Sequence, residues 1–181
     1  MLRLRPYQTN DACLIVSWTG DERAFRQWCA DRFDRYPVTA EELDRQYGAM
    51  AGSGRFYPMT ALDEAGRPAG HLILRFTDAG KTVIRFGFVI VDPEKRGRGV
   101  GRVMLRLSAR YAFESLGAEK VTLGVFENNG PALRCYRSAG FRETAAAPES
   151  YPILNETWKC LEMELPRSAF QAFEDTRDER K

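Results

Sequence analysis

The stretch "TVIRFGFVIVDPEKRGRGVGRVML", residues 82–105, decides the fold. It opens with β-branched and aromatic residues on both faces, which is typical of a strand in the middle of a sheet. An apolar helical pattern closes it, and we expect that helix to cover residues 99–116 and to end at Gly117. Between the two lies a turn with three glycines, Gly97, Gly99 and Gly101. The stretch therefore predicts a central strand that leads into a helix through a glycine-rich turn.

Such a turn can hold an anion, because the first N–H groups of a helix are unpaired and its macrodipole is positive there. Glycine lets the backbone approach a phosphate closely, and Arg96, Arg98 and Arg102 add charged donors. A dinucleotide fingerprint fails because Arg102 stands where its third glycine belongs. A Walker A loop fails because Gly101 precedes Arg102 and Val103 instead of Lys and Ser or Thr. A phosphate site of another kind remains, with a solvated turn that merely needs glycine as the alternative.

Arginines recur every four residues along the expected helix and therefore form one row on its surface. They are Arg98, Arg102, Arg106 and Arg110. The first two are placed to reach a phosphate, whereas we expect the second two to lie on a solvated face.

Composition excludes several functions. The chain has 181 residues and 44% hydrophobic residues, which fits one globular domain. Its 27 Lys and Arg nearly balance 25 Asp and Glu, so no global charge favours nucleic acid. Apolar runs stay far below the roughly 18 residues of a membrane span, and no signal-peptide core follows Met1. Four separated cysteines and the single His71 suggest no metal site. We expect a cytoplasmic protein without nucleic-acid or membrane partners.

The remaining patterns complete one α/β (α+β) domain over residues 1–166, followed by a charged tail over residues 167–181. Residues 9–51 predict two or three short helices, one of them capped by Thr19 or Asp21. Strands are predicted at "LRLRPY", "RFYPMTAL", "AGHLILRF", "KVTLGVF", "FRE" and "TWKCLEMEL", and a short helix at "NGPALRCYRSAG".

A second motif gives the turn a context. In "NNGPALRCYRSAGF" the residues fit the spacing N-x-x-A-x-x-x-Y-x-x-x-G-F, through Asn129, Ala132, Tyr136, Gly140 and Phe141. The turn itself fits R/Q-x-x-G-x-G/A after a central strand, through Arg96, Gly99 and Gly101. With both motifs in this order, the chain resembles the GNAT superfamily of N-acetyltransferases, over residues 82–141.

The resemblance implies an acyl-CoA N-acyltransferase fold, with a mixed, mostly antiparallel central sheet of six to seven strands flanked by helices. The two central strands would splay apart and hold the pantetheine arm of acetyl-CoA, while the turn holds its pyrophosphate. No metal is implied. The residues implied to bind the cofactor are Val89, Ile90, Val91, Arg96, Gly97, Arg98, Gly99, Val100, Gly101, Arg102 and Asn129.

The implied reaction is direct attack of a primary amine on the acetyl-CoA carbonyl in a ternary complex. A main-chain N–H near Val91 would stabilise the oxyanion, and Tyr136 would protonate the leaving thiolate. Some members carry a glutamate base five residues before the asparagine, where this chain has Gly124. A glycine inside a strand suggests a bulge or the close approach of another chain or a ligand. The base therefore stays open among Glu127, His71, Glu162 and a water chain.

The acceptor is implied to be a small-molecule or peptide amine, and a homodimer is compatible with the resemblance. Aromatic and acidic residues alternate in "WTGDERAFRQWCADRFDRYP", residues 18–37, which fits an acidic pocket for a cationic amine. Ordinary helices that bury aromatics and expose charges would give the same pattern. A non-catalytic CoA-binding sensor and transfer of another acyl group are the alternative functions.

Overall fold

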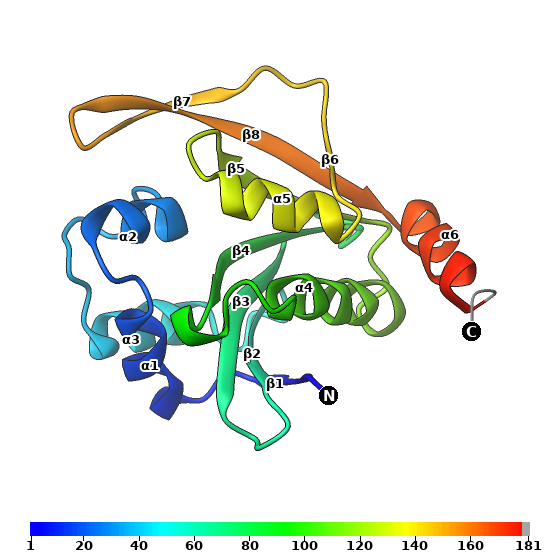
Figure 1. Ribbon diagram of the computed structural model, residues 1–181, viewed down its shortest axis with the longest axis horizontal. Coiled ribbons are helices and arrows are strands. Elements are labelled where there is room, and N and C mark those ends of the chain that lie inside the picture. The colour runs from blue at the N-terminus through cyan, green and yellow to red at the C-terminus, as the bar shows by residue number, and fades with distance from the viewer. Residues whose placement is uncertain (179–181) are drawn as a thin grey trace.

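A mixed sheet of eight strands runs through the computed structural model, which describes residues 1–178 (Figure 1). The strand order is β1-β2-β3-β4-β5-β8-β6, and β7 also pairs with β8. β4 and β5 are parallel, whereas the other neighbouring pairs are antiparallel. The strands are β1 (Arg3–Pro6), β2 (Phe56–Leu62), β3 (Pro68–Phe76), β4 (Val83–Val91), β5 (Lys120–Phe126), β6 (Arg142–Glu143), β7 (Glu149–Ile153) and β8 (Glu156–Pro166). The predicted mixed, mostly antiparallel sheet is confirmed, with one strand more than expected.

Helices cover both faces of this sheet. They are α1 (Ala12–Ser17), α2 (Glu22–Cys29), α3 (Ala40–Met50), α4 (Val100–Arg110), α5 (Gly130–Ser138) and α6 (Arg167–Asp178). On one face, α1 to α3 bury Phe25 and Leu43 in a cluster with Phe88 of β4. On the other face, α4 and α5 bury Met104 and Tyr136 in the main core. The sheet is therefore the middle of three layers, and β4 contributes to both cores.

Capping side chains mark the starts of two helices on the first face, and one of them, Asp21, is a predicted cap. Asp21 caps α2 by accepting a hydrogen bond from the Ala24 N–H at 2.7 Å. Thr39 and Glu42 form a capping box at the start of α3. These side chains satisfy amides that the first helical turn leaves unpaired, which explains why the chain breaks into short helices here.

Two strands separate at the centre of the sheet. β4 and β5 pair only from Val83 opposite Lys120 to Phe86 opposite Leu123. Beyond that point the register between β3 and β4 shifts, and Phe88 adopts a left-handed φ of 49°. β4 stays paired to β3 and β5 to β8, so the two central strands run on without pairing each other. The splay predicted at the two central strands is present.

β7 was not predicted from the sequence. It pairs with β8 around a tight turn at Leu154 and Asn155, whose φ values of 52° and 59° are left-handed. Pro152 within the strand cannot donate to a sheet ladder, so it argues against a strand in the sequence. The resulting β7–β8 hairpin extends the sheet beyond β5, on the side that faces α2 (Figure 1).

The helix expected over residues 99–116 is divided, because α4 ends at Arg110 and a π-helical turn, Tyr111–Ser115, completes it. Arg106 is buried, with only 8% of its surface exposed, so the expected solvated position is wrong for this residue. Its guanidinium lies 5.1 Å from the centre of the Phe170 ring of α6. α6 covers this part of α4, so Arg106 packs in the interior instead of facing solvent.

The segment expected to be a charged tail begins as a packed helix. Phe170 of α6 is only 4% exposed and belongs to the main core. Arg167 fastens the start of α6 by donating to the Ala118 carbonyl at 2.7 Å. The division between residues 1–166 and residues 167–181 stays a prediction, and residues 179–181 lie outside the described part of the chain.

Candidate active site

A cleft of about 830 Å³ opens where β4 and β5 separate. It is bounded by α2 and by the starts of α4 and α5. The residues implied to bind the cofactor line it at Val89, Ile90, Val91, Arg96, Gly97, Gly99, Val100, Gly101, Arg102 and Asn129, together with Tyr136. Arg98 does not line the cleft, although the sequence grouped it with its neighbours.

The glycine-rich turn presents free amides to this cleft. Gly99 is the N-cap of α4 with a φ of 79°, and Gly97 has a φ of 74°. The Val103 N–H donates to the Gly99 carbonyl, so the three preceding amides have no acceptor within the helix. Gly101 serves another purpose, since a Cβ there would lie 2.9 Å from Cys135 Sγ. Two glycines therefore give the turn its conformation, and the third lets α5 approach α4.

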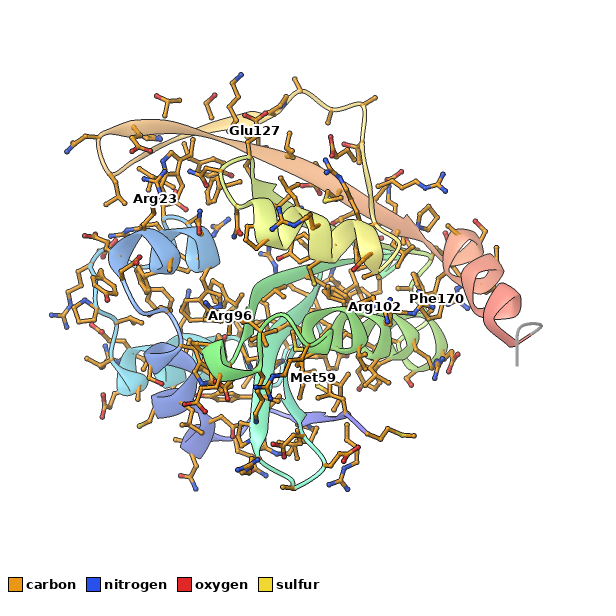
Figure 2. The ribbon with its side chains drawn as sticks, viewed as in Figure 1. Arg23, Met59, Arg96, Arg102, Glu127 and Phe170 are labelled. Carbon is orange, nitrogen blue, oxygen red and sulfur yellow. The ribbon has the colours of Figure 1, made fainter. Side chains whose placement is uncertain are left out.

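Arg96 holds the turn in place. Its Nε donates to the Val91 carbonyl at 3.0 Å, and Nη2 donates to the Trp18 carbonyl at 3.0 Å. The side chain thus joins the turn to the end of β4 and to the chain after α1. Arg102 and Arg134 are exposed where they line the cleft, so their guanidinium groups supply positive charge at its rim (Figure 2 labels Arg96 and Arg102).

The second motif places two residues on the opposite wall. Asn129 caps α5, because its Oδ1 accepts from the Ala132 N–H at 3.2 Å, and its amide nitrogen keeps its N–H donors. Tyr136 follows two turns later and is 8% exposed. Burial raises the pKa of its phenol far above the usual value, so the hydroxyl stays protonated at neutral pH.

None of the three candidate bases lines the cleft. His71 is fully buried on β3, where its Nε2 lies 2.8 Å from the Tyr47 hydroxyl. Burial lowers the pKa of His71 to about 3. Glu127 is exposed after β5 and lies beside β8, well apart from the start of α4 (Figure 2). Glu162 on β8 is ion-paired to Arg85 at 2.5 Å.

Gly124 is covered by an arginine. A Cβ at this position would lie 2.7 Å from Arg85 Nη2 and 2.9 Å from Cys160 Sγ. Arg85 starts on β4 and reaches Glu162 on β8, so its side chain crosses β5 at Gly124. The group that approaches this glycine is thus a side chain of the protein itself, instead of the other chain or ligand that the sequence suggested. The sequence reasoning missed Arg85 itself, although a charged residue inside an apolar central strand needs a partner and was therefore a usable signal.

The cleft is cationic. Among the described residues that line it there is no Asp or Glu, whereas the basic residues are Arg32, Arg85, Lys95, Arg96, Arg102 and Arg134. The acidic residues of the α2 segment lie elsewhere, with Asp21 as a cap and Glu22 near Arg26 at 3.5 Å. Of the aromatic residues in this segment, Trp18 and Trp28 line the cleft, whereas Phe25, Phe33 and Tyr36 pack in the core cluster of this face. The acidic pocket expected for a cationic amine is therefore not formed. The alternative applies, in which the acidic residues of these helices lie on their exposed surfaces.

Contacts from α2 close the far side of the cleft. Arg23 makes two hydrogen bonds to the Glu156 carboxylate, at 3.1 Å and 3.2 Å, and its guanidinium lies over the Trp158 ring at 5.0 Å. Gln27 Nε2 donates to Asn128 Oδ1 at 3.0 Å. Figure 2 shows Arg23 on the side of α2 that faces β7 and β8. Exposed polar side chains of α2 thus connect this helix to β8 and to the chain that follows β5.

The model of the Acetyltransferase (GNAT) family matches residues 21–141, which contain most of the residues that line this cleft. The chain belongs to the GNAT family of acetyltransferases. This GNAT chain is 45% identical over 135 residues to the streptothricin acetyltransferase of Streptomyces lavendulae, covering 74% of this chain and 70% of that protein. It is 30% identical over 102 residues to a peptidyl-lysine N-acetyltransferase of Escherichia coli, covering 52% and 59% of the two chains.

Solved structures agree with the GNAT fold. A spermidine N-acetyltransferase of Vibrio cholerae, crystallised with CoA and spermine, superposes with a TM-score of 0.80 at 21% identity. The superposition covers 94% of this GNAT chain and 98% of that chain. Within residues 1–178, no helix is long and apolar enough to traverse a bilayer. The same residues contain no group of three or more His, Cys, Asp or Glu side chains suited to a metal ion.

Proposed function

We propose that this enzyme transfers the acetyl group of acetyl-CoA to the primary amine of a small molecule. The observation that carries the proposal is the cleft between the splayed β4 and β5, with the free amides of the α4 N-terminus at one end and Tyr136 on its wall. The relative that acts on streptothricin supports a small-molecule acceptor.

Donor binding divides between main chain and side chains. The amides of Val100, Gly101 and Arg102 would hold the pyrophosphate, because helix N-termini bind anions. The Arg102 guanidinium would add charge-assisted hydrogen bonds at the exposed rim. Main-chain groups of residues 89–91, which β5 does not pair, would bind the pantetheine amides, except for the Val91 carbonyl, which accepts from Arg96. The Asn129 amide nitrogen would donate to the same arm.

The chemistry follows from this placement. The thioester of acetyl-CoA supplies an activated carbonyl, and the bound pose holds the acceptor nitrogen against it. As the C–N bond forms and the C–S bond breaks, the sulfur takes the proton of the Tyr136 hydroxyl, which water then replaces. The proton lost by the nitrogen leaves to water. A main-chain N–H near Val91 would stabilise the oxyanion.

Calorimetry with acetyl-CoA, followed by thiol release with a panel of amines, tests the proposal. We expect binding and turnover from the native chain. Gly99→Glu should abolish binding, because a carboxylate would stand among the amides that hold the pyrophosphate.

Gly66→Glu is the matched control, because Gly66 has a similar φ of 77° and open space around it but lies in the hairpin between β2 and β3. Both variants carry the same backbone strain, so only Gly99→Glu should lose acetyl-CoA. Equal binding by the two variants would contradict the phosphate site, and binding without turnover by the native chain would indicate a sensor. The cytoplasmic location and the homodimer remain predictions from the sequence.

A further inference from the structure

Two of the basic residues in the cleft stand apart from the donor site. Arg85 lies six residues before the end of β4, which places it about 20 Å along the strand from Val91 and the turn that follows. Arg32 lies in the chain that follows α2 and also lines the cleft. The phosphates of the donor would meet Arg102 and Arg134 at the other end of the cleft.

Arg85 retains capacity for a ligand. Its Nη1 donates to Glu162 Oε1, yet 31% of the side chain is exposed and it lines the cleft. A guanidinium has five N–H donors in a planar fork, so one carboxylate contact leaves several of them available. The crossing over Gly124 fixes the position of this fork on the sheet surface.

Further positive charge gathers around Arg85. Arg75 on β3 pairs in register with Arg85, so both side chains lie on the same sheet face. Arg75 is exposed, and partial desolvation, followed by the nearby charges of Arg32 and Arg85, lowers its pKa. Arg32 is 61% exposed, and its ion pair with Asp31 is long, at 4.0 Å. Arg32 and Arg85 both line the cleft, and Arg75 lies next to Arg85 in the sheet without lining it.

Like charges brought together cost free energy, which an anion bound between them recovers. Glu162 offsets part of the charge of Arg85, and Asp31 lies 4.0 Å from Arg32, but no Asp or Glu is among the described residues that line the cleft. A polycationic acceptor would add to the repulsion.

Resting on the proposed function, we propose that the acceptor amine also carries a carboxylate or a similar anionic group, and that Arg32 and Arg85 bind it. The acceptor class is thus amino-acid-like instead of polyamine-like.

Pairs of amines that differ only in the anionic group test this inference. L-Lysine and 1,5-diaminopentane share an amine on the same carbon chain, and several amino acids would each be compared with their own amides. Aminoethylphosphonate beside ethylamine extends the comparison to a second anion, and spermidine represents polycations. We expect kcat/KM to be at least about tenfold higher for the anionic member of the preferred pair.

Faster acetylation of the amides or of spermidine would overturn the inference and leave the proposed function intact. Acetylation of none of these amines, despite acetyl-CoA binding, would instead count against the proposed function itself and against the inference with it.

Variants then assign the residues. Arg32→Gln should lower kcat/KM for the anionic acceptor about tenfold to a hundredfold, mainly through KM, and leave its uncharged partner and the KM for acetyl-CoA unchanged. Arg85→Gln combined with Glu162→Gln should do the same, because the double change leaves no unpaired carboxylate to disturb folding. Arg67→Gln, an exposed arginine outside the cleft, is the control. Equal losses for both members of a pair would overturn the assignment.

Discussion

The guanidinium of Arg85 lies over the backbone of Gly124, so close that a Cβ at Gly124 would stand 2.7 Å from Arg85 Nη2. Glu162, the residue opposite Gly124 in the β5–β8 register, completes the arrangement by pairing with Arg85. Where some relatives place a glutamate, this chain therefore has an arginine that reaches across the strand to a carboxylate on the next one.

Gly124→Ala should destabilise the fold, because the new methyl group must displace both Arg85 and the Cys160 sulfur, which would lie 2.9 Å away. We expect a loss of about 1–3 kcal/mol in the free energy of unfolding, measured by urea denaturation. Adding Cys160→Ala should recover part of it.

Gly48→Ala is the control for that measurement, since Gly48 lies in α3 with nothing within 4 Å of its Cβ position. It should stabilise the chain by about 0.5–1 kcal/mol. A stable Gly124→Ala variant would mean that Arg85 does not occupy the space above the glycine.

Tyr136→Phe should lower kcat about a hundredfold or more, because it removes the proposed general acid, with little change in the affinity for CoA. The raised pKa of Tyr136 also predicts that the native enzyme shows no activity loss from this group below pH 10. Tyr57→Phe is the control, since the Tyr57 hydroxyl donates to the Gly54 carbonyl in the turn between α3 and β2, and Tyr57 does not line the cleft. A loss of CoA affinity without loss of kcat would make Tyr136 a structural residue.

His71 should make the fold sensitive to acid. Its imidazole takes a proton only near pH 3 when folded but at its ordinary pKa of 6.5 when unfolded, so acid favours the unfolded chain between these values. Stability should fall by about 1.4 kcal/mol per pH unit there and be independent of this group above pH 6.5.

His71→Gln should remove that slope, as unfolding measured at several pH values would show, while the amide can still meet the Tyr47 hydroxyl. If the variant instead moved the acidic limb of the activity profile, His71 would be acting as the base.

Phe170→Ala should destabilise the chain by about 3 kcal/mol, because the ring is only 4% exposed and packs on Phe113 at 5.2 Å between ring centres. Gln171→Ala, at an exposed position of the same helix, should stay within about 0.5 kcal/mol. Thermal denaturation compares the two. Equal stability would mean that residues 167–181 are a tail and not part of the packed domain.

Most of the fold could be predicted because its signals are local. The apolar run of β4, the left-handed glycines before α4 and the caps at Asp21 and Thr39 all act within a few residues. The two motifs likewise identified the residues that line the donor end of the cleft.

The remainder depends on contacts between distant segments. Arg106 looks like one member of a surface row until α6, sixty residues later in the chain, covers it. The role of Gly124 becomes clear only when the sheet register brings Arg85 and Glu162 to either side of it. β7 forms because it pairs with β8, in spite of Pro152. The sequence pattern of residues 149–153 does not predict a strand.

The cationic lining of the cleft also bears on how the acceptor becomes a nucleophile. Surrounding positive charge disfavours an ammonium ion and lowers the pKa of a bound amine. The positive electrostatic potential of the pocket would then reduce the need for a general base, because it favours the neutral amine at a pH closer to 7. For a series of acceptors, the acidic limb of kcat/KM should move with the amine's own pKa, whereas a fixed limb would identify a group on the protein.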